Sequence, residues 1–236
     1  MDLKYQNAVS GIILAICPGG DPDNGGGDGA GGSQDIVIDM IDNPCLRQVL
    51  DEMNNTNSTL FKEIVNTFDN TDAINVSLYN YYSNTDGNLG ETTGALGANS
   101  FTIGINTFYS NGSSEEDIAG TYLHEMVHAY LMAYPTAWDT SNTQHVIMMT
   151  NLLDHMVEDL QSIFPTLPEK DAYAISYNGL TYDSDPTTNT TNTIIQSIMI
   201  QRLNSKFPGV TIPEMTALGK SYQKGGNKGT KTSNCQ

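Results

Sequence analysis

Basic residues are scarce in this chain, and the scarcity limits what it can bind. Lysine and arginine together number 10 in 236 residues, against 27 acidic residues, and the only arginines are Arg47 and Arg202. The net charge is −17. Because proteins hold nucleic-acid phosphates with clustered basic side chains, we predict no nucleic-acid partner. The acidic balance favours solubility and says little about the fold.

Long apolar runs and cysteines are also few. No stretch approaches the roughly 20 apolar residues that a bilayer-spanning helix needs, so we predict no transmembrane helix. Three cysteines, Cys17, Cys45 and Cys235, allow one disulfide and leave its pairing open. The modest apolar stretch 8–16 has two interpretations: an export signal that ends at a lipid-modified Cys17, or a strand or ordinary chain start. A lipid anchor at Cys17 would place the chain at a bacterial cell envelope, and secretion is the alternative.

Composition divides the chain into three parts. Residues 1–35 form an N-terminal segment with a linker rich in glycine and aspartate. The linker does not match an EF-hand calcium loop, because the twelfth position counted from Asp21 is Gly32 where a glutamate is needed. Residues 36–215 are long enough for one domain with its own core. Residues 216–236 hold four lysines among glycines and polar residues, and we predict a flexible tail there.

Apolar periodicity predicts an α+β fold whose second half is helical. Alternating apolar residues predict strands over 74–79 and 101–106, separated by the turn-rich stretch 83–99. A spacing of 3.6 residues predicts helices over 45–53, 60–68 (capped by Asn57-Ser58-Thr59), 143–164, from 168 to a stop at Asn178-Gly179, and 193–203.

One further helix, of about 20 residues, is expected beside the small mixed sheet. A capping box from Ser113 to Glu116 marks its start, and Pro135 marks its end. The predicted helix therefore starts directly after Ser113 and ends at Tyr134, and an apolar run surrounds its middle.

That middle is the motif His124-Glu125-Met126-Val127-His128, or HExxH. Residues four apart share a helix face, so His124 and His128 can hold one Zn²⁺ ion while Glu125 reaches a water molecule on it. Catalytic zinc prefers imidazole ligands and lowers the pKa of that water to about 7. A neighbouring carboxylate then acts as general base and later gives the proton to the leaving amine. The motif predicts a zinc-dependent hydrolase with Glu125 as its catalytic residue.

A third zinc ligand has to come from outside the motif. The thermolysin-like glutamate about 20 residues after His128 is absent, and the metzincin extension HExxHxxGxxH fails at Tyr134. The remaining candidates are His145, His155, Glu158 and Asp159. His145 lies 17 residues after His128, at the start of the next predicted helix, whereas His155 lies among carboxylates in a pattern typical of surface ion pairs.

The spacing of His145 resembles that of the SprT-like zincins, in which a third histidine follows HExxH after a short connection. The likeness to bacterial SprT-like metallopeptidases covers most of residues 36–210 and includes Asn43-Pro44-Cys45-Leu46, Gln144-His145, Phe164-Pro165, Asp171-Ala172-Tyr173-Ala174 and Gly179-Leu180. Tyr177-Asn178 stands where that group has tryptophan-glycine. The resemblance implies a zincin-like domain, zinc held by His124, His128 and His145, and a protein or peptide substrate. The DNA-repair members have basic regions that this chain lacks, so their substrate is not carried over.

Two functions are compatible with these residues. The first is a zinc metallopeptidase, either housekeeping or a secreted effector, whose substrate adds as a strand to an edge strand over 102–107. The second is a non-catalytic, zinc-stabilised binding module tethered at the cell envelope. For the peptidase, the residue that would stabilise the oxyanion is left open among four tyrosines, Tyr130, Tyr134, Tyr173 and Tyr177.

Overall fold

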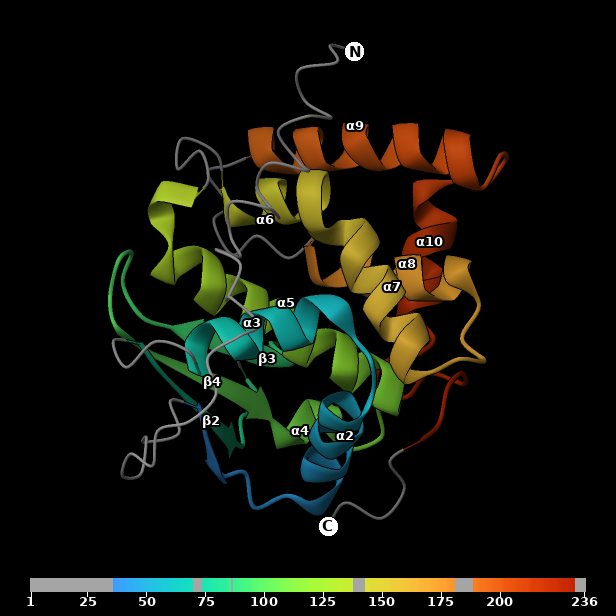
Figure 1. Ribbon diagram of the computed structural model, residues 1–236. Helices are drawn as coiled ribbons and strands as arrows, with labels where there is room; N and C mark the ends of the chain where they lie inside the picture. The colour runs from blue at the N-terminus through green and yellow to red at the C-terminus, as the bar shows by residue number, and fades with distance from the viewer. Residues whose placement is uncertain (1–35, 70–73, 86, 138–142, 181–188, 232–236) are drawn as a thin grey trace.

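The helix that contains HExxH lies at the centre of the molecule. A computed structural model describes residues 36–69, 74–85, 87–137, 143–180 and 189–231. Helix α5 (Glu115–Ala133) packs against a small sheet on one side and against helices from the second half of the chain on the other (Figure 1). The described chain is α+β and mostly helical, in agreement with the sequence prediction.

The sheet is mixed and has four strands in the order β1-β2-β4-β3. Strands β1 (Ile36–Met40), β2 (Asn75–Tyr81) and β4 (Ser100–Asn106) run parallel, and β3 (Gly90–Thr93) runs antiparallel to β4. Burial alternates in the first half of β2 and of β4, as the period of two predicts, and the last four residues of β4 are all buried.

This strand order corrects the predicted substrate strand. The segment expected at the edge, residues 102–107, belongs mostly to β4, which is paired on both sides by β2 and β3. Its backbone hydrogen-bonding groups are therefore already used. Strand β3 lies in the stretch 83–99, which we predicted to be rich in turns, and it is the edge strand next to α5.

Helices α2 (Pro44–Asn55) and α3 (Thr59–Asp69) lie where the periodicity predicts them. The Asn43 side chain caps α2 by accepting hydrogen bonds from the backbone amides of Cys45 and Leu46. For α3 the predicted local cap is replaced by a distant one. The carboxylate of Asp159 accepts from three backbone amides at 2.7–3.1 Å, those of Thr59, Leu60 and Phe61.

Helix α5 begins one residue later than the capping box indicates. A short helix, α4 (Thr107–Ser110), precedes it. The N-cap is Ser114, whose hydroxyl accepts from the amide of Asp117 at 3.1 Å, and Ser113 instead donates to the carbonyl of Tyr109. The helix ends before a 3₁₀ turn, η1 (Pro135–Ala137), so Pro135 terminates it as predicted.

The helix predicted over 143–164 is one helical run with an irregular centre. It consists of α6 (Gln144–Ile147), a π-helical turn η2 (Met148–Leu152) and α7 (Leu153–Ile163). Helix α8 (Glu169–Leu180) passes through Asn178-Gly179, where we predicted its end. Helix α9 (Asn189–Lys206) is longer than predicted and runs across the top of the view in Figure 1.

The prediction of a flexible C-terminal tail is wrong for residues 216–231. Helix α10 (Ile212–Lys220) begins with a capping box at Thr211 and packs against α8. The segment 221–231 then covers the start of α5: the amide of Ser114 donates to Tyr222 O at 2.9 Å, and the amide of Glu115 donates to Thr230 O at 2.9 Å. Residues 232–236 lie outside the described residues.

The N-terminal predictions also lie outside the described residues. Residues 1–35 include the linker and Cys17, so neither the export signal nor the lipid anchor is tested. Cys45 is disulfide-bonded, and the other cysteines, Cys17 and Cys235, are outside the described part. Among the described residues, no helix has the length and apolar character needed to cross a membrane.

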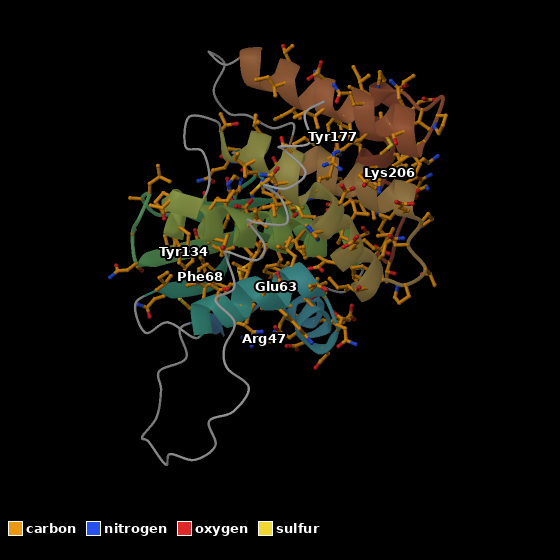
Figure 2. The ribbon with its side chains drawn as sticks, turned by 45° about the horizontal axis from the view of Figure 1, so that its top comes forward. Arg47, Glu63, Phe68, Tyr134, Tyr177 and Lys206 are labelled. Carbon is orange, nitrogen blue, oxygen red and sulfur yellow. The ribbon has the colours of Figure 1, made fainter. Side chains whose placement is uncertain are left out.

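Aromatic side chains fix the C-terminal end of α5. The ring of Tyr130 lies 6.5 Å from that of Phe68 on α3 and 5.1 Å from that of Tyr134, measured between centroids. Figure 2 shows Phe68 and Tyr134 next to each other at this end of the helix. Such rings pack favourably at these distances, so the α5 helix is held at this end as well as at its capped start.

Candidate metal centre

Three histidines meet beside α5. The Nε2 atom of His128 lies 3.0 Å from Nε2 of His124 and 3.1 Å from Nε2 of His145. One ligand atom from each ring can be chosen so that all three lie within 4.8 Å of one another. His124 is buried and the other two are half-buried. The residues are therefore close enough to bind one metal ion.

The sequence explains why the third histidine arrives here. Thr143 caps α6 by accepting from the amide of Val146, so the helix starts one residue before His145. Its neighbour Gln144 accepts, through Oε1, a hydrogen bond from Nδ1 of His128. A proton on Nδ1 leaves the lone pair of His128 Nε2 directed at the other two rings. The sequence alone contains no signal for this role of Gln144, although the residue adjoins His145.

Burial lowers the pKa of two of the three rings. It lowers the pKa of His124 well below its usual range, and the neighbouring His128 and His145 lower it further. Burial, together with His145, lowers the pKa of His128 to about 4, although the hydrogen bond with Gln144 opposes the shift. A histidine must be neutral to bind a metal ion. At neutral pH these two rings are in that state.

Glu125 lies beside the cluster and is 7 % exposed. Burial raises the pKa of its carboxyl group to about 7; a hydrogen bond from Thr92 opposes this rise and the charge of Glu91 adds to it. The Thr92 hydroxyl, on β3, lies 2.7 Å from Glu125 Oε2 and 2.9 Å from its backbone carbonyl. The edge strand thus holds this side chain, a contact for which the sequence contains no signal.

Two glycines allow backbone segments to approach the site. A Cβ atom on Gly90 would lie 2.7 Å from the Thr121 methyl carbon and 3.0 Å from Cγ of Glu125, so glycine lets β3 lie against α5. A Cβ atom on Gly179 would lie 3.1 Å from Nδ1 of His124. Helix α8 therefore reaches the first histidine ring closely at a residue where we had predicted its end.

The other candidate ligands lie elsewhere. His155 pairs with Glu158 at 3.5 Å, and the Glu158 side chain is 70 % exposed. Asp159 accepts hydrogen bonds from the backbone amides at the start of α3. Burial raises the pKa of its carboxyl group, and these hydrogen bonds oppose the rise. In the described ranges, the only group of three or more candidate ligand residues close enough to share an ion is His124, His128 and His145.

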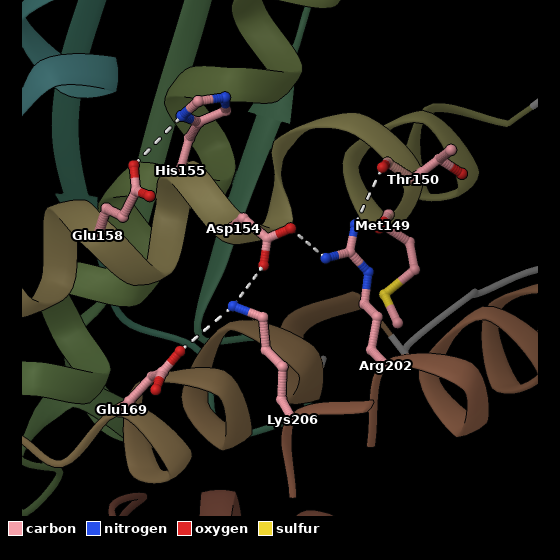
Figure 3. A network of polar contacts seen from close by, with 8 residues as sticks. All are labelled: Met149, Thr150, Asp154, His155, Glu158, Glu169, Arg202 and Lys206. Atoms are coloured by element: carbon pink, nitrogen blue, oxygen red, sulfur yellow. Dashed lines mark hydrogen bonds and ion pairs between the residues drawn. The ribbon is translucent and has the colours of Figure 1, made fainter. Parts of the chain in front are cut away.

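The π-helical turn after His145 is held by Arg202 of α9. Its guanidinium donates to the carbonyls of Met149 at 3.2 Å and Thr150 at 3.0 Å, and it pairs with Asp154 at the start of α7 (Figure 3). Lys206 joins Asp154 to Glu169 at 3.4 and 3.2 Å. A π turn departs from the regular helical hydrogen-bond pattern, and Arg202 donates to two of its carbonyl groups.

The histidines and Glu125 line a cavity of about 590 Å³. Its walls come from β3, α5, α6 and α8, and from the C-terminal segment through Gln223 and Lys224. None of the four tyrosines considered for oxyanion stabilisation lines this cavity; of the described tyrosines only Tyr109 does. Tyr130, Tyr173 and Tyr177 are buried in the core instead.

Comparison with known proteins adds no relative: no protein-family model, curated protein or solved structure matches this chain.

Proposed function

We propose that this chain is a zinc metallopeptidase in which His124, His128 and His145 hold zinc and Glu125 is the general base. The proposal rests on one observation: three Nε2 atoms meet beside a buried carboxylate that lines the same cavity. Three neutral imidazoles with an adjacent glutamate are the donor set of hydrolytic zinc sites.

The spacing of the nitrogen atoms fits the metal. Zinc–nitrogen bonds of about 2.0–2.1 Å in a tetrahedral shell imply ligand nitrogens about 3.3 Å apart. Two of the three pairs, those that include His128, are 3.0 and 3.1 Å apart. Three protein ligands leave a fourth position, which distinguishes catalytic from structural zinc sites.

When bound, zinc would supply a Lewis acid that activates water and polarises the peptide carbonyl. Glu125 would take the proton from water as oxygen adds to the carbonyl carbon, and return it to the nitrogen as the C–N bond breaks. Its raised pKa of about 7 suits both transfers near neutral pH. Thr92 would keep the carboxylate in place through its hydrogen bond to Oε2.

The substrate would lie along β3. Gly90, Glu91 and Thr92 line the cavity, and in the described part of the chain β3 pairs only with β4. An extended peptide can add to such a free edge through backbone hydrogen bonds, as substrates do in zincins generally. The scissile bond would then lie beside Glu125, which lines the same cavity.

Elemental analysis of zinc in the wild type, His145→Ala and His155→Ala tests the metal site. We expect close to one zinc per chain in the wild type and in His155→Ala, and loss in His145→Ala. Wild-type protein without zinc after reconstitution would refute the proposal. Loss of zinc in His155→Ala alone would refute the ligand set.

Cleavage of an unfolded protein by the zinc-loaded wild type and Glu125→Gln then tests the catalytic step. We expect hydrolysis by the wild type only, with equal zinc in both proteins. Equal turnover in the variant would remove Glu125 from the mechanism. Stoichiometric zinc without cleavage of any unfolded protein would favour the alternative of a zinc-stabilised binding module.

A further inference from the structure

The cavity extends well beyond the histidines, toward the start of α5. Asp117, Gly120 and Thr121 line it in addition to His124 and Glu125. Asp117 and His124 are seven residues apart, so they share a helix face and lie about 10 Å apart along the axis. An extended peptide advances about 3.3 Å per residue. Asp117 is therefore about three peptide residues from the metal centre.

Asp117 is a buried carboxylate with an unfilled acceptor. The residue is 6 % exposed, and its Oδ2 atom has no hydrogen-bond partner within the described structure. The Ser113 side chain hydrogen-bonds to the carboxylate. A buried carboxylate is costly unless it is paired, so an unfilled acceptor on a cavity wall indicates a ligand group that fills it.

A second such group lines the same cavity. Ser176 of α8 lines the same cavity, is 2 % exposed, and its Oγ atom also lacks a partner within the described residues. The two helices are close here, because a Cβ atom on Gly120 would lie 2.7 Å from Ile175. A hydroxyl and a carboxylate in the lining of one cavity suit a group with several N–H donors.

The nearby lysines are engaged with other groups. Lys224 lines the cavity, but its ammonium group donates to the carbonyl oxygen of Phe108 at 2.6 Å and lies 3.5 Å from the centroid of the Phe108 ring. Lys231 is near enough to lower the pKa of Asp117, yet its ammonium donates to Tyr222 O at 3.3 Å. Lys228 pairs with Asp171 at 2.6 Å.

We propose that Asp117, assisted by Ser176, forms a subsite for a lysine or arginine side chain of a peptide substrate, about three residues from the scissile bond. The inference rests on the proposed peptidase function and names its substrate class. The separation of about 10 Å is too long for the free amine of an aminopeptidase substrate, which lies one residue from the bond cleaved. A net charge of −17 would also attract basic peptides.

Binding tests the subsite separately from cleavage. The protein is zinc-loaded Glu125→Gln, and the probes are fluorescein-labelled alanine-rich nonapeptides with a single lysine placed at each position in turn. The matched probes have glutamine in place of lysine. We expect at least one lysine peptide to bind roughly tenfold tighter than its glutamine counterpart, because neutral glutamine cannot form the charge-assisted hydrogen bond that lysine forms. Fluorescence anisotropy gives the dissociation constants.

The variant Glu125→Gln/Asp117→Asn should lose the lysine preference, whereas Glu125→Gln/Glu115→Gln should keep it. Glu115 is two residues away on the same helix and does not line the cavity, so this control removes one charge without touching the subsite. Equal binding of lysine and glutamine peptides, or no binding of either, would overturn the inference. So would a preference that survives in Asp117→Asn.

Cleavage by the wild type separates this inference from the proposed function. Lysine-dependent binding without cleavage of any peptide would refute the peptidase and leave the subsite standing. Cleavage with no preference for lysine or arginine would refute the subsite and leave the peptidase standing. Circular dichroism and zinc content of each variant verify that the fold and the metal centre are retained.

Discussion

The guanidinium of Arg202 lies 3.0 Å from the carbonyl oxygen of Thr150, inside the π-helical turn that follows His145. The same group donates to the carbonyl of Met149 and pairs with Asp154. Helix α9 thus fixes the irregular segment on which the third histidine depends, although Arg202 is 57 positions away in sequence. Its effect on the metal would be indirect, through the position of α6.

The variant Arg202→Met should bind zinc about tenfold more weakly, because the π turn would lose two hydrogen bonds and α6 would be less well held. Lys206→Met is the matched control: it removes a cation one turn further along α9 that also pairs with Asp154. We expect it to change the zinc dissociation constant less than about twofold. Competition with a chromophoric chelator measures both. An equal effect of the two variants would contradict the role of Arg202.

Gln144 supplies a second prediction. Its Oε1 atom accepts the proton of His128 Nδ1, so Gln144→Ala should weaken zinc binding by about 10- to 100-fold. Gln144→Glu keeps an acceptor at the same place and should restore the affinity. Isothermal titration with zinc would distinguish them. If both substitutions weakened binding equally, orientation of His128 by Gln144 would be ruled out.

The parts of the site that follow local helix geometry could be predicted from sequence. The i, i+4 spacing places His124 and His128 on one face, and the cap at Thr143 makes His145 the second residue of its helix. The contacts of Gln144 with His128 and of Thr92 with Glu125 could not be predicted, because they join segments whose relative positions depend on tertiary packing. Helix periodicity contains no information on such pairs.

The order of the strands and the structure of the C-terminal segment could not be predicted from sequence patterns either. Alternation identified β4, but it cannot tell an internal strand from an edge strand, and β3 was too short to give a pattern. The lysine-rich segment 221–231 is polar and rich in glycine, which is typical of flexible chain. It is ordered because Lys228 pairs with buried Asp171 and because its backbone bonds the start of α5.

Asp159 provides a test of a carboxylate once considered as a metal ligand. Because it caps α3 through three amides, Asp159→Ala should lower the free energy of unfolding by about 2 kcal/mol and leave zinc content unchanged. Glu158→Ala, at an exposed position next to it, should change stability by less than about 0.5 kcal/mol. Urea denaturation measures stability, and loss of zinc in Asp159→Ala without unfolding would contradict the capping role.

The last prediction concerns pH and Asp117. Burial raises the pKa of this carboxyl group to about 7, from 3.8, although a hydrogen bond with Ser113 and the charge of Lys231 oppose the shift. Between these values the folded state holds a proton that the unfolded state has lost, so stability falls as pH rises from about 4 to about 7. Above pH 7 the carboxyl group is ionised in both states, and the folded state carries the full free-energy cost of the buried charge.

Asp117→Asn should therefore match the wild type in stability below pH 4 and exceed it above pH 7. The difference is at most about 4 kcal/mol, at about 1.4 kcal/mol per pKa unit. Urea denaturation at pH 4, 6 and 8 measures it, with Asp51→Asn, an exposed carboxylate of α2, as the control for net charge. A stability gain in Asp117→Asn that did not grow with pH would contradict the raised pKa. A residue that costs stability when charged, yet lines the cavity beside the metal centre, is what a binding function would retain.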